Sequence, residues 1–197
     1  FTIATVDKRY APSPYSGSFT VNGASVSVTI NFYLVTFNIT FTESGLPSGT
    51  LWFVNLSNGQ SFNGSLTSIT FNEPNGSYSF TIATVDKRYA PSPYSGSFAV
   101  NGANVSVTIN FYLVTFKITF TESGLPSGTL WFVNLSNGQS FKGNSTSITF
   151  SEPNGSYSFT IATVDKSYAP SPYSGSFTVN GASVSISINF SPFTYAV

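Results

Sequence analysis

The sequence predicts an all-β protein made of tandem, small antiparallel β-sandwich domains, and two observations lead to this fold class. The first is a repeat, because the segment FTIATVDK begins at Phe1, Phe80 and Phe159 and therefore recurs every 79 residues. A period of this length matches a small independent domain and is too long for the coil of a solenoid. The second is the alternation of apolar and polar residues between Gly, Pro and Asn-Gly turns, which is typical of strands.

The frame of the repeat sets the expected domain boundaries. The segment YLVTF opens a strand at the start of each complete copy, and an INF segment ends the last strand. We therefore predict complete sandwiches over residues 33–111 and 112–190. Residues 1–32 are expected to be the second half of a sandwich. Residues 191–197 are expected to be the opening strand of a further domain or a strand donated to another subunit.

The expected core follows from the alternation. The opening strand places the apolar residues from Val35 to Phe41 on one face, and the closing strand of the first copy does the same from Ala24 to Phe32. We expect both apolar faces to point into a core. Asn-Gly pairs suit the tight turns of hairpins. About six or seven short strands per copy indicate an immunoglobulin-like or a prealbumin-like sandwich, and the alternation favours neither topology.

The composition is unusual for a globular domain. The chain has seven basic and seven acidic residues, a formal net charge of zero, and no His, Cys or Met. Charged residues make up 7%, whereas about a quarter is usual. A balanced charge excludes a general electrostatic attraction to nucleic acid or anionic lipid. No apolar run approaches the roughly 20 residues that span a bilayer, so we expect no membrane segment in this chain.

The residue types also exclude most active-site chemistry. Without His or Cys, the usual general base and most transition-metal sites are missing. The carboxylates Glu43 and Glu73 stand beside turn residues, in ESGLP and NEPNG, where a solvated or capping role is expected. Calcium would need a spaced acidic loop, which is also missing. We therefore predict that the protein is not an enzyme and has no catalytic, metal or cofactor-binding residues.

A family resemblance follows from three segments of the repeat. TFTESGLPSGTLWFVNL, followed by EPNGSYSFTI and GSFTVNGA, resembles the ESGLPSGT-type β-sandwich repeats of secreted and surface proteins of acidophilic archaea. Such repeats also occur beyond the peptidase domain of thermopsin-like proteins. The resemblance covers the whole chain and implies an extracellular or cell-surface location. It does not imply peptidase activity, because no segment corresponds to a catalytic domain.

Asn-X-Ser/Thr sequons are frequent, and N-linked sugar would supply the hydration that the missing charges do not. We predict glycans on some of them. The candidates are Asn38, Asn55, Asn63, Asn75, Asn104, Asn134, Asn144, Asn154 and Asn189.

Aromatic residues in loops and at the end of the chain are candidates for contacts between domains or subunits, since Tyr combines a large apolar body with a polar tip. These interface candidates are Tyr10, Tyr15, Tyr89, Tyr94, Tyr168, Tyr173, Phe193, Tyr195 and Val197.

Two function classes remain. A structural subunit of an extracellular filament or cell-surface stalk predicts uniform domains that polymerise head to tail with copies of themselves. An adhesin, or an accessory binding module of a secreted archaeal protein such as a thermopsin-like protease, predicts one copy with divergent loops. The loops barely diverge, since RYAPSPY becomes only SYAPSPY in the last copy. This repetition favours the structural class.

Overall fold

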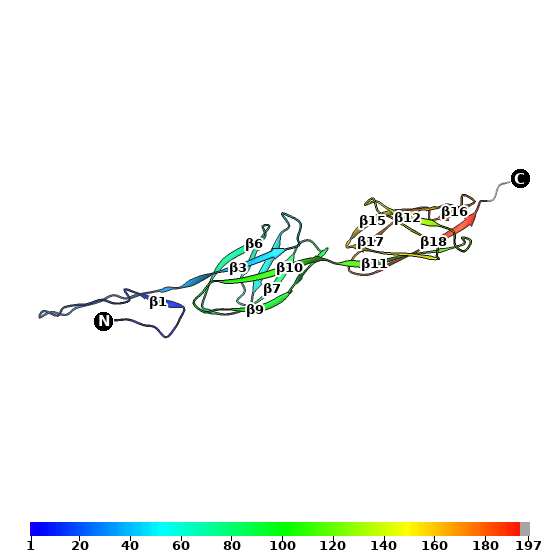
Figure 1. Ribbon diagram of the computed structural model, residues 1–197. Helices are drawn as coiled ribbons and strands as arrows, with labels where there is room; N and C mark the ends of the chain where they lie inside the picture. The colour runs from blue at the N-terminus through cyan, green and yellow to red at the C-terminus, as the bar shows by residue number, and fades with distance from the viewer. Residues whose placement is uncertain (194–197) are drawn as a thin grey trace. The chain divides into compact units, whose positions relative to one another are not determined.

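The computed structural model describes residues 1–193 and is all-β over these residues, which confirms the predicted fold class (Figure 1). The chain divides into two compact units, Phe1–Tyr112 and Leu113–Val197. Unit 1 contains a short two-stranded ribbon followed by one complete sandwich, and unit 2 is a second complete sandwich. The ribbon pairs β1 (Tyr10–Ser13) with β2 (Asn31–Leu34) in antiparallel fashion.

Two four-stranded sheets make up the sandwich of unit 1. One has the order β6-β3-β10-β8, and the other has the order β5-β4-β7-β9. The strands are β3 (Thr36–Ser44), β4 (Trp52–Leu56), β5 (Ser61–Gly64), β6 (Ser68–Pro74), β7 (Gly76–Thr84), β8 (Tyr89–Ser92), β9 (Ser95–Val100) and β10 (Val105–Leu113).

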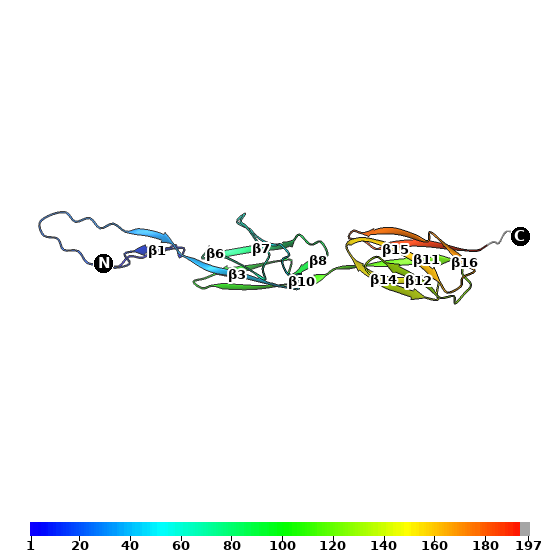
Figure 2. The same ribbon diagram turned by 90° about the horizontal axis from the view of Figure 1, so that it is seen from above.

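Unit 2 repeats this architecture. Its sheets have the orders β14-β11-β18-β16 and β13-β12-β15-β17, and β11 and β14 are hydrogen-bonded neighbours (Figure 2). The strands are β11 (Thr115–Ser123), β12 (Trp131–Leu135), β13 (Ser140–Gly143), β14 (Ser147–Pro153), β15 (Gly155–Thr163), β16 (Tyr168–Ser171), β17 (Ser174–Val179) and β18 (Val184–Pro192).

The first and last strands of each sandwich pair in parallel, which an entirely antiparallel sandwich would not show. Val105 of β10 lies opposite Ile39 of β3, and Val184 of β18 lies opposite Ile118 of β11. In an immunoglobulin constant-type domain the first two strands share a sheet. Here β3 and β4 lie in different sheets. Of the two topologies compatible with the sequence, the strand order therefore favours the prealbumin-like one.

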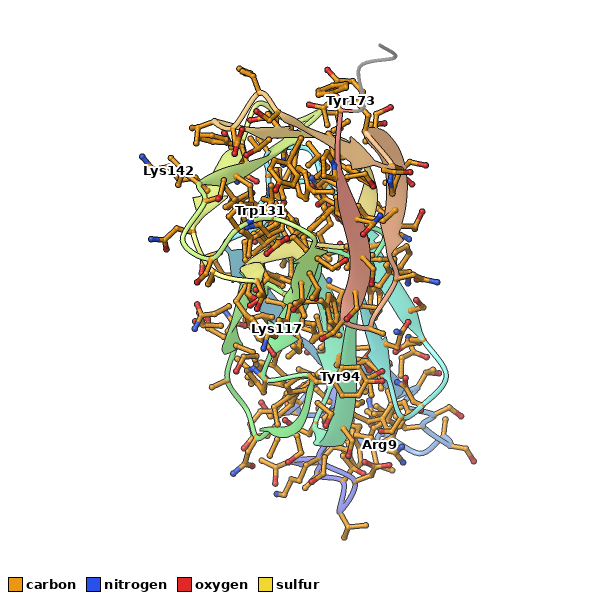
Figure 3. All side chains as sticks on the ribbon, turned by 90° about the vertical axis from the view of Figure 1, so that its right-hand side faces the viewer. Arg9, Tyr94, Lys117, Trp131, Lys142 and Tyr173 are labelled. Carbon is orange, nitrogen blue, oxygen red and sulfur yellow. The ribbon has the colours of Figure 1, made fainter. Side chains whose placement is uncertain are left out.

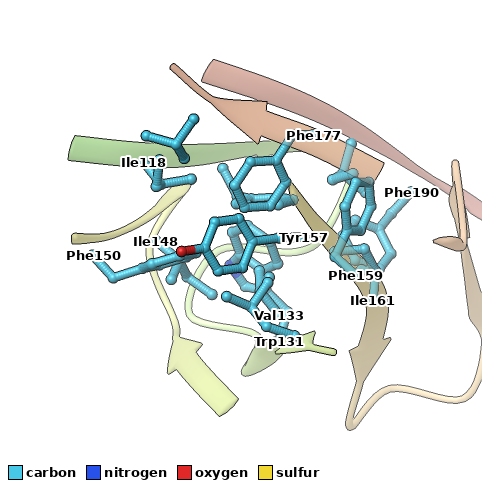
Figure 4. Packing of buried hydrophobic residues seen from close by; sticks show 14 residues of the cluster. Ile118, Trp131, Val133, Ile148, Phe150, Tyr157, Phe159, Ile161, Phe177 and Phe190 are labelled. Atoms are coloured by element: carbon cyan, nitrogen blue, oxygen red, sulfur yellow. The ribbon is translucent and has the colours of Figure 1, made fainter. Parts of the chain in front are cut away.

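The core lies between the two sheets and confirms the alternation of the opening strand. Ile39 and Phe41 of β3 are fully buried. In unit 2 the ring of Phe120 meets that of Phe159 edge to face, with centroids 5.0 Å apart. Trp131 is also fully buried, and its indole Nε1 donates to the carbonyl oxygen of Ser145 at 2.9 Å (Figure 4). The only polar atom of this large side chain is thereby satisfied.

The closing strand behaves differently in different copies. In β10, Ile109 and Phe111 are buried as expected. In the first copy the prediction of a core-facing strand from Ala24 to Phe32 is wrong, because Val26 and Val28 are 44% and 45% exposed. Within the described residues, the only strand pairing of that segment is at Asn31 and Phe32, which lie opposite Ser13 and Pro12 in the ribbon. A closing strand therefore becomes buried only where a second sheet covers it.

Strand ends extend past the expected limits of the copies. Both β10 and β18 continue two residues beyond the INF segment, to Leu113 and Pro192. After β18, the backbone amide of Phe193 donates to the carbonyl oxygen of Ser167 at 2.8 Å. The part of the expected opening strand or donated strand that covers residues 194–197 lies outside the described residues.

Candidate interaction surfaces

The predicted sequons fall into two groups by exposure. Five asparagines are exposed and four are half-buried. The exposed ones are Asn38, Asn63, Asn104, Asn144 and Asn189, and the half-buried ones are Asn55, Asn75, Asn134 and Asn154.

The half-buried sequons on β4 and β12 bond across strands through their side-chain oxygen. Asn55 Oδ1 accepts a hydrogen bond from Ser61 Oγ at 2.6 Å, and Asn134 Oδ1 accepts one from Ser140 Oγ at the same distance. The serine in each case lies on the antiparallel neighbour strand. These bonds fix the side-chain rotamer while directing the acceptor, rather than the amide nitrogen, toward the protein.

The half-buried sequons in the turns between β6 and β7 and between β14 and β15 are bound more firmly. Asn75 Oδ1 accepts from the backbone amide of Gly102 at 2.7 Å, and Asn154 Oδ1 accepts from that of Gly181 at 2.7 Å. Both glycines have positive φ, of 76°, which L-residues rarely adopt. In each domain the asparagine therefore ties its own turn to the neighbouring Asn-Gly turn.

The loop tyrosines divide in a similar way. Tyr15, Tyr94 and Tyr173 are exposed, each by about two thirds of their surface, and Tyr10 is exposed by 42%. Figure 3 labels Tyr94 and Tyr173 among the exposed side chains. In contrast, Tyr89 and Tyr168 pack against the cores of their domains. For these two residues, packing within the domain accounts for the burial of much of the side chain.

Three of the interface candidates meet around a groove in unit 2. The groove has a volume of about 400 Å³, and Tyr168, Tyr173 and Phe193 contribute to its wall together with Asp165 and Lys166. Phe193 is 55% exposed. The groove is therefore partly aromatic, with one acid and one base at its edge. The candidates Tyr195 and Val197 lie outside the described residues.

Two carboxylates lie deeper than expected. The prediction that Glu73 is solvated is wrong, because it is only 3% exposed, as is its counterpart Glu152. Glu73 has the same parity along β6 as the buried Ile69 and Phe71, and this alternation could have revealed its position. Glu43 is 8% exposed, and its Oε2 accepts from the amide of Leu46 at 3.3 Å, as a turn-capping role requires.

Burial has an electrostatic consequence in unit 2. Desolvation raises the pKa of Glu152 above its ordinary value, while hydrogen bonds from Tyr157 and Asn137 lower it in part. The Oε1 atoms of Glu73 and Glu152 are buried and have no hydrogen-bond partner. For Glu152, burial therefore disfavours the charged form of the carboxyl, because burying a charge is costly.

Over residues 1–193, no three carboxylates gather closely enough to hold a metal ion. The same residues include no helix long and apolar enough to cross a membrane.

Comparisons with known proteins support the fold. No family model matches the chain, and no curated protein matches it. A solved structure of the Bacillus anthracis TIE protein is 12% identical with a TM-score of 0.59, and the alignment covers 86% of this chain and 40% of that one. The chain thus spans less than half of the TIE protein, and the similarity supports the sandwich fold alone.

Two pilins align less closely. The minor pilin GBS52 of Streptococcus agalactiae is 12% identical with a TM-score of 0.38, over 81% of this chain and 98% of that one. The shaft pilin SpaA of Lactobacillus rhamnosus GG is 12% identical with a TM-score of 0.31, over 82% of this chain and 100% of that one.

Proposed function

We propose that the chain is a structural subunit of an extracellular filament or cell-surface stalk built from tandem β-sandwich repeats. The observation that supports this most is where the two complete domains differ. Of ten differing positions in 79, nine are exposed in unit 1, and the tenth exchanges a half-buried Val for Ile. The pairs are Asn38/Lys117, Asn63/Lys142, Ser65/Asn144, Leu66/Ser145, Asn72/Ser151, Arg88/Ser167, Ala99/Thr178, Asn104/Ser183, Val107/Ile186 and Thr108/Ser187.

This distribution fits a structural role better than a catalytic or binding role. A specialised site would require at least one domain with its own loop chemistry, since sites are built from loops on a common scaffold. The loops ESGLPSG, EPNGS and APSPYSG are instead the same in both complete copies. Uniform loops favour an element whose function is to extend a polymer.

The proposed partners are other copies of the chain, arranged head to tail. The ribbon region leaves apolar residues such as Val21 and Phe19 more than half exposed, and strands from a neighbouring copy could cover them. Residues 191–197 are the proposed donated strand. In this arrangement two different surfaces of the chain meet, which is a heterologous contact. Repeated contacts of this kind form a filament when the copies do not close into a ring.

N-linked glycans are proposed to supply surface hydration, and one loop provides a reason. In unit 1 the sequon Asn63-Gly64-Ser65 lies at the end of β5. In unit 2 Lys142 replaces the asparagine, and a new sequon begins two residues later at Asn144. The loop therefore keeps one exposed sequon although its residues change.

An adhesive role remains a second candidate because of the groove around Tyr168, Tyr173 and Phe193. A concave, partly aromatic surface of about 400 Å³ falls in the size range of small-ligand sites. The same tyrosines are present in every copy, however, so an adhesin of this kind would bind repeatedly along its length.

Electron microscopy tests the proposal. The purified chain, and separately the surface of the cells that produce it, are imaged by negative stain. Fibres one domain wide that label with an antibody to the chain are expected. Dispersed short particles in both preparations would contradict a filament or stalk.

A truncated chain tests the head-to-tail contact. Deleting residues 194–197, which leaves β18 and its pairing with β16 complete, is expected to abolish fibres in the purified preparation, while circular dichroism shows that both sandwiches remain folded. Fibres that persist in the truncated chain would exclude strand donation by this segment but not the filament itself.

A further inference from the structure

The side chain of Asn75 connects the complete domain of unit 1 to the half-repeat that precedes it. Asn75 lies in the turn between β6 and β7. Its Nδ2 donates to the carbonyl oxygen of Lys8 at 2.8 Å, while its Oδ1 accepts from the amide of Gly102 at 2.7 Å. Lys8 belongs to the half-repeat, and Gly102 belongs to the same domain as Asn75. The carboxamide thus uses its donor across the repeat boundary and its acceptor within one domain.

The next carbonyl of the half-repeat is held by the same domain. The amide of Val35, at the junction of β2 and β3, donates to the carbonyl oxygen of Arg9 at 2.8 Å. The ribbon strand β1 begins one residue later, at Tyr10. Two successive carbonyls are therefore bound by the following domain. The Val35 bond is made by backbone and tolerates substitution, whereas the Lys8 bond depends on an amide side chain at position 75.

A groove lined mostly by polar residues lies beside this hydrogen bond. This open groove of about 430 Å³ separates the two sides of the boundary, with Asp7, Lys8 and Arg9 on one side and Asn75 and Asn101 on the other. Asp7 and Arg9 form an exposed ion pair, 2.7 Å long, within their own loop. Because hydrogen bonds are directional and hydrophobic contact is not, the hydrogen bonds to the Lys8 and Arg9 carbonyls fix the orientation at this boundary.

We propose that Asn75 is a boundary clamp: a positioning residue that holds the preceding repeat through the Lys8 carbonyl, so that its Asn-Gly-Ser sequon is not a glycan acceptor in the folded chain. An N-linked sugar is attached through the asparagine side-chain nitrogen. That nitrogen is the atom which donates to Lys8. A glycan would replace one of the two hydrogens of this nitrogen and place a sugar beside the Lys8 carbonyl, so clamp and glycan compete for the same atom. The inference rests on the proposed stalk and deepens it, because it identifies what would stiffen the joint between residues 1–32 and the complete domain of unit 1.

The repeat carries the same residues further along the chain. Asn154 and Lys87 stand 79 residues after Asn75 and Lys8. Asn154 Oδ1 accepts from the amide of Gly181 at 2.7 Å. The half of the clamp that lies within one domain is thus present in both sandwiches.

Limited trypsin digestion of the full chain measures the clamp, because cleavage after Lys8 must release the carbonyl that Asn75 binds. Asn75→Asp keeps an oxygen for Gly102 but replaces the donor with an acceptor. The digestion is run at high ionic strength to screen the new charge, and mass spectrometry measures the release of the peptide Phe1–Lys8. We expect this release to be about fivefold faster in Asn75→Asp than in the wild type, as the loss of one hydrogen bond predicts. Cleavage after Lys142 in the same digest is the internal reference and should not change.

Two control variants separate the alternatives. Ser77→Ala removes the sequon without touching the carboxamide and is expected to digest like the wild type. Asn63→Asp introduces the same chemical change at an exposed sequon and is also expected to have no effect. An unchanged rate in Asn75→Asp, with an unchanged melting temperature, would overturn the clamp. A glycan on Asn75 in the folded native protein would do so too. Because the digest uses the dispersed chain, its outcome is independent of whether filaments form.

Discussion

Two segments of nearly the same sequence adopt different structures in this protein. Residues 1–34 and 80–113 differ only at Thr20/Ala99 and Ser25/Asn104. The later segment forms most of β7 and all of β8, β9 and β10, whereas the earlier one forms only the four-residue strands β1 and β2. Strand propensity is therefore insufficient to explain which segment forms long strands, since both segments have nearly the same propensity.

Burial follows the same division. Val100 is 3% exposed, and its counterpart Val21 is 67% exposed. Ile109 is fully buried. The later segment pairs β7 with β4 and β10 with β3, both of which come from residues 36–56. Among the described residues, the strands of the segment 1–34 pair only within that segment. The difference shows that the strands of one repeat stabilise each other across long sequence separations.

Supplying the missing partners should produce the largest effect. A chain with a copy of residues 33–79 fused before Phe1 is expected to fold the segment 1–34 into a full sandwich. Amide hydrogen exchange would show protection at Val21 and Val28 rising from near zero to the level of their counterparts in unit 1. If protection stays low although the fused domain is soluble, the presence of partner strands does not explain the difference between residues 1–34 and 80–113.

Removing the centre of one core should produce the next largest effect. Trp52→Ala creates a cavity between the sheets of unit 1 and is expected to cost about 3–5 kcal/mol. Scanning calorimetry should then show the transition of unit 1 at a much lower temperature. Trp131 lies in a separate core, so the transition of unit 2 should not move, and a joint shift of both would mean that the two cores are coupled.

The pH dependence of stability should also differ between regions of the chain, because their carboxyl groups have pKa values shifted in opposite directions. Burial raises the pKa of Glu152, so its protonated form stabilises unit 2 below the ordinary glutamate pKa, and this stability is lost as pH rises through the higher folded value. Glu152→Gln is expected to flatten that decline and to stabilise unit 2 at pH 7. Thermal unfolding from pH 3 to 7 measures it, and a variant that is less stable at pH 7 would contradict the sign.

The half-repeat should show the opposite trend. Hydrogen bonds from Arg9 to the side chain of Asp7 lower the pKa of that exposed carboxyl to about 2. Its ionised form is favoured above the ordinary aspartate pKa, and this preference is lost as pH falls toward 2. Nuclear magnetic resonance titration of the Asp7 carboxyl should therefore find a midpoint below that of a model peptide, and Arg9→Ser should raise it toward the ordinary value, although the backbone amide of residue 9 still donates to Asp7.

The smallest effect is expected for an ion pair in which the arginine is exposed and the aspartate is half-buried. Arg88 Nη2 lies 2.7 Å from Asp86 Oδ2, while serine occupies the equivalent position 167. Arg88→Ser is expected to change the stability of unit 1 by no more than about 1 kcal/mol, as for most surface ion pairs. A larger loss in chemical denaturation would indicate that the guanidinium does more than pair with Asp86.

Much of the fold could be predicted from local pattern. Alternation identified the buried face of β3, including Ile39 and Phe41, because side chains of a strand point to opposite faces in turn. The same rule would have placed Glu73 inside, but its position beside the turn NEPNG outweighed the alternation. Among the candidate contacts, exposure of Tyr15, Tyr94 and Tyr173 agrees with their position in Pro-rich loops.

By itself, the sequence determined the repeat, the all-β class and the faces of the strands, because these depend on neighbours one or two residues apart. Only the tertiary structure decided which strands pair. The parallel pairing of β3 with β10, the exposure of Val26 and Val28, and the contact of Asn75 with Lys8 all join residues far apart in the chain. Such contacts depend on which partner strands are present and on where the chain brings them, and a local pattern contains neither.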